Sequence, residues 1–314
     1  MGSAPRSLSK ESGARRATKV RVMHQEGLKA VEKLVTARRE PYETLGVRPL
    51  TPVIGAEIEG LDLASDLSNL QFAEVRRALL EHHVIVFRNQ HLSAEEHKSF
   101  ARRFGKLHVH PIQAMRGGDS ERLEVKANKD SKFVAGEGWH SDVTCDIEPP
   151  MGSLLYIEQT PEIGMGGDTL FANMHLALEM LSAPMRALLE TLTAVHDGTI
   201  PWVQGYGYQP KQDFPKSEHP VVVRHPETGR KLLYVNRGFT SHIPQLTRFE
   251  SNAVLEMLYR HIETQPALFC RVRWTPNTLV FWDNRCTQHQ AIWDYYPLDR
   301  SGYRVSVVGE RPAA

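Results

Sequence analysis

The segment LVFWDNRCTQHQA, residues 279–291, decides how the chain can fold. A run of apolar and aromatic residues passes directly into polar ones, which is typical of a buried strand that ends at a turn. Many short strands separated by few helices predict a mainly β fold, a closed double-sheet β core that carries helical insertions. The other strand-like segments of the last third are HPVVVRH (219–225), KLLYVN (231–236), FCRVRW (269–274) and YRVSVVGE (303–310).

Amphipathic segments predict the helical insertions. Ser68 and Ser93 stand where a helix N-terminus needs a capping side chain, and Glu96 can complete a Ser-x-x-Glu capping box with Ser93. Apolar residues recur at helical spacing behind these caps and in two later segments. The predicted helices cover residues 68–83, 93–105, 174–192 and 247–263.

The N-terminal region differs in composition from the rest. Residues 1–17 are polar and Arg-rich, which indicates disorder, and residues 18–42 read as a charged helix that Pro41 ends. We therefore expect two parts, an N-terminal tail and helix over 1–46 and a single catalytic domain over 47–314.

Composition and charge exclude several functions. The 314 residues carry 38 basic and 37 acidic side chains, a net charge of +1, which provides no overall field for nucleic acid or an anionic membrane. No apolar run approaches the roughly 20 residues of a membrane span. The three cysteines form no CxxC motif, and the N-terminus has no apolar signal core, so we expect a cytoplasmic protein.

The motif EGWHSDVTCD, residues 137–146, carries a metal-ligand pair. Residues two apart on a strand or its edge point to the same side, so His140 and Asp142 can aim at one point. His289 at the end of the opening segment supplies a third ligand. Two imidazoles and one carboxylate form the facial triad of non-haem Fe(II) oxygenases, which leaves coordination positions open for substrates.

Two arginines follow the third ligand in the sequence. Arg300 and Arg304 are four residues apart on an expected strand and can share one face. A guanidinium binds a carboxylate through paired, charge-assisted hydrogen bonds. The spacing therefore suits two anions that converge on one metal ion.

Seven motifs in order resemble the taurine/α-ketoglutarate dioxygenase (TauD/TfdA-like) family over most of residues 47–312. The resemblance implies a double-stranded β-helix (jelly roll, cupin-like) flanked by helices, with Fe(II), 2-oxoglutarate and O2 as metal and cosubstrates. Family members tend to be homo-oligomers, dimers or tetramers. The motifs are PVIGAEIEGLDL, HHVIVFRNQHLS, FARRFGKLHVHP, WHSDVTCDIEPP, GGDTLFANM, FWDNRCTQHQAIWDYYP and RSGYRVSVVGERP.

The resemblance also implies a role for each site residue. It makes His140, Asp142 and His289 the iron ligands. Arg300 and Thr169 would bind 2-oxoglutarate. His110 and Arg304 would bind the anionic head group of the prime substrate.

Two positions depart from the taurine enzymes. Gln113 stands where they place a tyrosine, and Gly136 stands where they carry an asparagine. Both positions contact the amine end of taurine in the family, so a different small anion is expected, namely a sulfonate, a sulfate ester or a carboxylate. Hydroxylation of a C–H bond next to the heteroatom would release succinate and CO2, with an aldehyde and sulfite or sulfate as further products.

Two alternatives remain open at this point. A zinc hydrolase could use the same two histidines and carboxylate, although no HExxH motif is present and the Arg300 pocket would then have no purpose. A non-catalytic jelly-roll binding protein is the other alternative, against which the complete triad argues. The remaining residues near the motifs, Trp139, Phe281, Trp282, Cys145 and Cys286, are interpreted as buried core residues.

Overall fold

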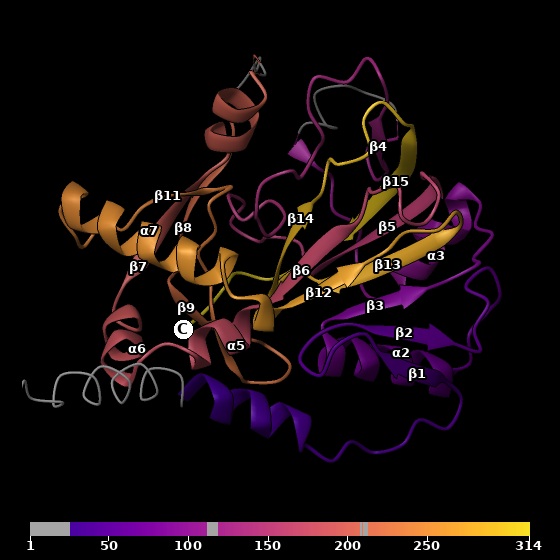
Figure 1. Cartoon of the computed structure of the whole chain (residues 1–314), viewed down its shortest axis with the longest axis horizontal. Coiled ribbons are helices and arrows are strands. Elements are labelled where there is room, and N and C mark those ends of the chain that lie inside the picture. Colours follow the sequence, from indigo (N-terminus) through magenta and orange to yellow (C-terminus); the bar gives the residue numbers. More distant parts are fainter. Residues whose placement is uncertain (1–25, 112–118, 208, 210–212) are drawn as a thin grey trace, which may run out of the picture.

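A seven-stranded sheet forms the centre of the molecule (Figure 1). The computed structural model describes residues 26–111, 119–207, 209 and 213–314. All neighbouring strands of this sheet are antiparallel except β2 and β3, which are parallel. In spatial order the strands are β1 (Gly46–Pro49), β2 (Ala56–Glu59), β3 (Val84–Phe87), β13 (Thr278–Asp283), β5 (Gly152–Gln159), β15 (Arg300–Val307) and β4 (Leu123–Ala127).

A smaller antiparallel sheet lies against one face of the large sheet. It contains β12 (Phe269–Val272), β6 (Thr169–Asn173) and β14 (Thr287–Ala291) in that order. Successive side chains of β3 alternate between two cores: Val84 and Val86 pack with residues of the smaller sheet, whereas Ile85 and Phe87 pack with helical residues. This period of two is that of a sheet buried on both faces. The predicted double-sheet β core is therefore confirmed.

Helices α2 (Asn69–His82) and α3 (Ala94–Arg102) cover the other face of the large sheet. Both begin with the predicted serine cap, and both caps form complete capping boxes, Ser68 with Gln71 and Ser93 with Glu96. The predicted end of the second helix at residue 105 is three residues too late. Its last turn gives way to the tight turns of residues 103–105, where Gly105 has φ of +152°.

A lobe of insertions lies beside the two sheets (Figure 1). The single helix predicted over 174–192 is wrong: α5 (Met174–Glu179) and α6 (Ala183–Leu189) are separate, because Pro184 lacks the N–H that a continuous helix would use. The predicted helix over 247–263 is confirmed as α7 (Arg248–Glu263). The lobe also contains β7 (Thr193–Asp197), η1 (Ile200–Gly205), β8 (Lys216–Pro220), β9 (Val222–Arg224), β10 (Lys231–Leu233), β11 (Thr240–His242) and η2 (Pro266–Leu268).

The N-terminal helix is shorter in the described part of the chain than the sequence predicts. Residues 26–35 are helical, and the helix ends well before Pro41. Residues 18–25 of the predicted helix and the predicted tail over 1–17 lie outside the described residues. Among the helices that the structure describes, none has both the length and the apolar character to cross a membrane.

Candidate metal and cosubstrate site

A backbone bridge brings the two predicted imidazole ligands together. The His140 N–H donates to the His289 carbonyl at 3.1 Å, and the His289 N–H donates to the His140 carbonyl at 2.8 Å. Such a doubly bonded antiparallel pair fixes two residues directly opposite each other. His289 lies on β14, whereas His140 forms only this isolated bridge, and a turn follows it. The expectation that Asp142 shares a strand edge with His140 is therefore wrong.

Asp142 is held at the same point by side chains rather than by strand periodicity. Its N–H donates to Asn284 Oδ1 at 2.6 Å, and Asn284 Nδ2 donates back to the Asp142 carbonyl at 2.9 Å. Ser153 Oγ on β5 donates to Asp142 Oδ2 at 2.8 Å. Arg304 on β15 forms an ion pair with Asp142 Oδ1. These contacts leave the carboxylate fixed beside the two imidazoles.

The protonation states of the three groups suit a divalent cation. Burial lowers the pKa of both His140 and His289, so both imidazoles are neutral with lone pairs available. Burial alone would raise the pKa of Asp142, but its polar neighbours, Arg304 foremost, outweigh it and lower the pKa well below its ordinary value. Two neutral imidazoles and one carboxylate are the donor set of non-haem Fe(II) sites.

The geometry also fits a bound metal ion. One candidate ligand atom from each of His140, Asp142 and His289 lies within 4.8 Å of the other two. His140 Nδ1 lies 2.8 Å from the Gly138 carbonyl. A ring N–H on Nδ1 would leave the lone pair on Nε2 for a metal ion, and Nε2 lies 3.7 Å from Asp142 Oδ1. Metal-binding histidines characteristically use the second ring nitrogen in this way. The residues present therefore fit Fe(II).

A buried guanidinium begins β15, the strand that also carries Arg304. The Arg300 side chain is only 3% exposed and makes no ion pair with any residue that the structure describes. It packs on the Trp274 ring, 5.2 Å from the centroid, and Trp274 Nε1 donates to Thr169 Oγ1 at 3.0 Å. The nearby acid Asp168 is already bound by Arg271 at 2.5 Å. Burial lowers the pKa of Arg300, whose neighbours Tyr295 and Asp168 oppose this change.

The remaining predicted residues that the structure describes contact Arg304 or His140, or share a cavity with one of them. His110 and Arg304 both line a small cavity of about 10 Å³, and the His110 ring meets Trp202 edge-on with centroids 5.5 Å apart. Gly136 adopts φ of +83°, and a Cβ there would lie 3.1 Å from His140 Cε1. The predicted substrate residue Gln113 lies outside the described residues. A larger cavity of about 270 Å³ lies elsewhere, between β9 and the C-terminus, and contains none of these residues.

Sequence reasoning missed the residues that orient the ligands. Asp142 is bound by Ser153 and Asn284, and Arg300 packs on the Trp274 ring. Tyr206 accepts a hydrogen bond from the Gly136 N–H at 3.0 Å. Serine, asparagine and tryptophan at such positions carry no spacing signal, because their partners are distant in the sequence. Of these residues, only Asn284 could have been suspected from the sequence, because it directly follows the apolar strand β13 and lies five residues before His289.

Comparisons with known proteins agree with this geometry. The family model described as "Taurine catabolism dioxygenase TauD, TfdA family" matches residues 46–306. An alpha-ketoglutarate-dependent sulfonate dioxygenase of Saccharomyces cerevisiae is 33% identical over 87% of this chain and 69% of its own length. An alkylsulfatase of Acinetobacter baylyi is 34% identical over 88% of this chain and 89% of its own length.

Solved structures show the same fold. The crystal structure of a taurine dioxygenase from Burkholderia xenovorans superimposes with a TM-score of 0.74 at 38% identity, covering 86% of this chain and 91% of that one. The predicted double-stranded β-helix is therefore confirmed, as are Fe(II), 2-oxoglutarate and O2 as the metal and cosubstrates. The chain belongs to the TauD/TfdA family of Fe(II)- and 2-oxoglutarate-dependent dioxygenases.

Proposed function

We propose that this enzyme hydroxylates a C–H bond next to the heteroatom of a small organic sulfonate or sulfate ester. One observation carries the proposal: β15 carries two guanidinium groups, of which Arg304 pairs with Asp142 of the triad, while the buried Arg300, four residues earlier, has no carboxylate partner among the described residues. A buried charge without a partner is costly, so a site of this kind is suited to an anionic ligand. The relatives named for sulfonates and alkyl sulfates favour the same class.

His140, Asp142 and His289 would hold the iron. Iron(II) bound there supplies the activation of O2, which is coupled to the conversion of 2-oxoglutarate into succinate and CO2. The protein's task is to position both organic substrates and to keep water away. Asn284 and Ser153 serve this task by fixing the Asp142 carboxylate from two sides.

Arg300 would bind the distal carboxylate of 2-oxoglutarate. Its planar guanidinium can donate two parallel hydrogen bonds to a carboxylate, and the Thr169 hydroxyl would add a third. Trp274 connects the two groups, since it lies under Arg300 and donates to Thr169. The tryptophan therefore acts as a positioning residue for the cosubstrate.

Arg304 and His110 would bind the anionic head group of the prime substrate. Arg304 uses Nη1 for Asp142, and a guanidinium has five N–H donors, so others remain for a second anion. Support comes from the small cavity that Arg304 and His110 both line. A sulfonate or sulfate held there would present its neighbouring carbon toward the three ligands.

Gly136 argues for a substrate other than taurine. A Cβ at this position would lie only 3.1 Å from His140 Cε1, so a side chain here would crowd the ring of that ligand. No side chain at residue 136 is therefore available to contact the amine of taurine, and we propose a bulkier or more apolar substrate. Gln113, which lies outside the described residues, is proposed to border the same end of the substrate.

The products follow from the position of the hydroxyl group. A carbon that carries both a hydroxyl group and a sulfonate or sulfate is unstable. Its C–S or C–O bond breaks, the hydroxyl proton leaves, and an aldehyde forms together with sulfite or sulfate. We further propose that residues 47–314 act as one catalytic domain, that the enzyme is cytoplasmic, and that it works as a homo-oligomer on small molecules.

Family membership decides against the zinc hydrolase and the non-catalytic binding protein. The substrate is tested by incubating the enzyme with Fe(II), 2-oxoglutarate and O2 across sulfonates, alkyl sulfates, phenoxyalkanoates and acyl amino acids. Succinate above the uncoupled background, with equivalent sulfite or sulfate from a sulfur-containing substrate, is the expected result. If only carboxylates raised succinate, the sulfur-based proposal would be wrong, and the family's carboxylate substrates would replace it.

A further inference from the structure

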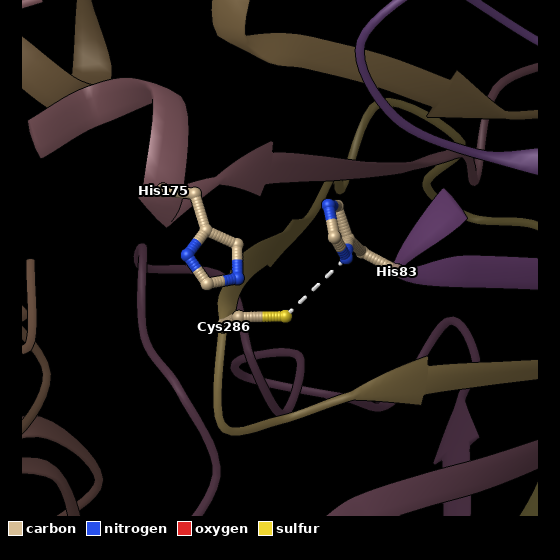
Figure 2. Close-up of side chains that lie close together, drawn as sticks. All are labelled: His83, His175 and Cys286. Carbon is tan, nitrogen blue, oxygen red and sulfur yellow. Dashed lines mark hydrogen bonds between the residues drawn. The ribbon is translucent and has the colours of Figure 1, made fainter. Parts of the chain in front are cut away.

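A second group of metal-binding side chains lies outside the catalytic site. His83, His175 and Cys286 point toward one another (Figure 2), and one ligand atom from each lies within 4.8 Å of the other two. We refer to these three residues as the His–His–Cys cluster. His175 is fully buried, while His83 and Cys286 are 2% and 1% exposed. The cluster is therefore sealed from solvent.

Three segments that are distant in the sequence meet at this cluster. His83 lies between α2 and β3, His175 is the second residue of α5, and Cys286 lies in the turn from β13 to β14. Backbone hydrogen bonds tie these segments together: Asp283 N–H donates to the His83 carbonyl at 2.8 Å, and Met174 N–H donates to the Cys286 carbonyl at 3.0 Å. The rigid backbone thus positions all three side chains.

One ring nitrogen of His175 has no partner within the described part of the chain. The other, Nδ1, lies 2.8 Å from the Lys231 carbonyl, which fixes the N–H on that atom and leaves a lone pair on Nε2. Nε2 is buried and has no hydrogen-bond partner among the residues that the structure describes. Figure 2 shows the ring turned so that one nitrogen faces Cys286 and His83. Buried nitrogens normally have a partner, and a carbonyl on the second nitrogen is the usual arrangement of a metal-binding histidine.

The neighbouring polar network is saturated by comparison. His225 Nε2 lies 2.9 Å from Asp283 Oδ2, and His225 Nδ1 accepts the N–H groups of Glu227 and Thr228, both at 3.2 Å. Arg285 binds both carboxylate oxygens of Asp283, at 2.8 and 2.7 Å. That network needs no ion, although Asp283 lies close to Cys286. Of these two neighbouring groups, only the His–His–Cys cluster contains a buried side-chain nitrogen without a partner in the described part of the chain, namely His175 Nε2.

The separation within the cluster matches a coordinated ion. Cys286 Sγ lies 3.5 Å from His83 Nδ1. Ligands at zinc–sulfur and zinc–nitrogen distances of about 2.3 and 2.05 Å with a tetrahedral angle are about 3.6 Å apart. A thiol-to-imidazole hydrogen bond would explain the same distance, but it would leave the lone pair of His175 Nε2 without a partner.

We propose that the His–His–Cys cluster binds one Zn²⁺ through His83 Nδ1, His175 Nε2 and Cys286 Sγ. Two imidazoles and a thiolate form a donor set that zinc prefers. On binding, the Cys286 thiol gives up its proton to solvent and the sulfur becomes an anionic ligand. The ion has a structural role, because it fixes the turn between β13 and β14 to the segments that carry His83 and His175. Cys286 in this turn lies three residues before His289 of the triad.

The surroundings are consistent with this role. Burial lowers the pKa of both imidazoles, that of His175 to about 3, so both keep their lone pairs at neutral pH. Burial also raises the pKa of the Cys286 thiol well above its ordinary value. Without a cation the thiolate is therefore unfavourable there, and a divalent ion would reverse that preference.

The test uses the cobalt–thiolate charge-transfer absorption of the full-length protein. One sample is purified without chelator and its zinc is measured by mass spectrometry, and a second sample is unfolded and refolded with Co²⁺. The wild-type protein is expected to show the thiolate absorption after refolding with cobalt. The catalytic triad contains no sulfur, so His140→Ala is expected to keep the band, which separates this proposal from the function proposed above.

Matched cysteine variants locate the site. Cys286→Ala and His175→Gln are expected to lose the thiolate band and one zinc per chain. Cys270→Ala, which changes another buried free cysteine, is expected to keep both. The proposal is overturned if the refolded wild-type protein lacks the band, if the band survives in Cys286→Ala, or if it disappears in Cys270→Ala. Absence of the band from the refolded wild-type protein overturns the proposal even where a variant fails to fold.

Discussion

The catalytic triad and the His–His–Cys cluster each contain two imidazoles. They differ in the third ligand group and in exposure to solvent. In the triad the third group is a carboxylate held by Arg304, and the His140 side chain is 14% exposed. In the cluster it is a thiol, and no member is more than 2% exposed. A hard carboxylate at an opening suits a metal that must exchange ligands, whereas a sealed thiolate suits a permanent one.

The largest expected effect separates the two sites. His140→Ala removes one imidazole of the triad and should lower substrate-dependent succinate formation by more than about 100-fold, to background, because a missing ligand costs more than a missing orienting partner. Binding of Fe(II), followed by calorimetry, should weaken in parallel. His91→Ala, at an exposed histidine, serves as the control. Turnover at wild-type level in His140→Ala would remove the triad from the mechanism.

The second prediction concerns the saturated network beside the cluster. Asp283→Ala removes the buried carboxylate that Arg285 and His225 share and leaves Arg285 with only the partly exposed Glu227, so the free energy of unfolding should fall by about 3–5 kcal/mol. Burial alone would raise the pKa of Asp283, but Arg285 and His225 outweigh it and lower it well below its ordinary value. Urea unfolding at neutral pH gives the measurement.

An exposed ion pair is the control for that variant. Glu256 pairs with Arg237 at the surface of α7, where water screens the charges, so Glu256→Ala should change stability far less. Equal losses in both variants would mean that burial does not distinguish the two ion pairs.

A third prediction concerns 2-oxoglutarate. Arg300→Ala removes a buried, charge-assisted hydrogen-bond donor, and about 1.5–3 kcal/mol of binding free energy corresponds to a 10- to 150-fold rise in the 2-oxoglutarate concentration required. Steady-state succinate formation measures this change, and the rate at saturating cosubstrate should recover in part.

The control for Arg300→Ala is Arg273→Ala. Arg273 precedes Trp274 in the sequence, but its side chain is exposed rather than buried. Its loss should therefore leave the 2-oxoglutarate requirement unchanged. An unchanged requirement in Arg300→Ala would mean that another group binds the distal carboxylate.

The smallest effect concerns a buried histidine that belongs to neither metal-binding group. Burial, with a further contribution from Arg122, lowers the pKa of His97 to about 3. The folded protein keeps this ring neutral, whereas the unfolded chain takes up a proton below about pH 6.5. The free energy of unfolding is therefore unaffected by His97 above that pH. It declines as the pH falls toward 3, and His97 accounts for a loss of about 1.4 kcal/mol at about pH 5.5.

Replacing that histidine should remove its share of the acid sensitivity. His97→Leu is expected to lose about 1.4 kcal/mol less than the wild-type protein between about pH 7.5 and about pH 5.5. Chemical unfolding at the two pH values measures the difference, and His91→Leu, at the exposed histidine, should behave like the wild-type protein. An unaltered pH slope in His97→Leu would show that His97 titrates normally in the folded state.

Local signals in the sequence predicted much of the fold. Ser68 and Ser93 mark helix starts because a cap is satisfied by residues within one turn. The apolar run of β13 predicted a buried strand, because its composition alone identifies it. The break between α5 and α6 was missed, although Pro184 was visible, because the apolar spacing on both sides resembles one continuous helix.

The candidate site was predictable only as far as its motifs reach. His140, Asp142 and His289 follow from ligand type and from the family resemblance. Long-range contacts carry no such pattern, which is why Ser153 and Asn284, which orient Asp142 from other segments, were missed. The His–His–Cys cluster was interpreted through Cys286 alone as a buried hydrophobic residue, because its members are distant in the sequence.

The backbone bridge between His140 and His289 has a consequence for the lifetime of the bound metal. Because each residue donates to the other's carbonyl, neither imidazole can leave the site through a local opening without breaking the pair. The two ligands should therefore fluctuate as one unit. Their amide protons should exchange with solvent at closely similar rates, and metal release should be limited by the same opening that exposes both amides.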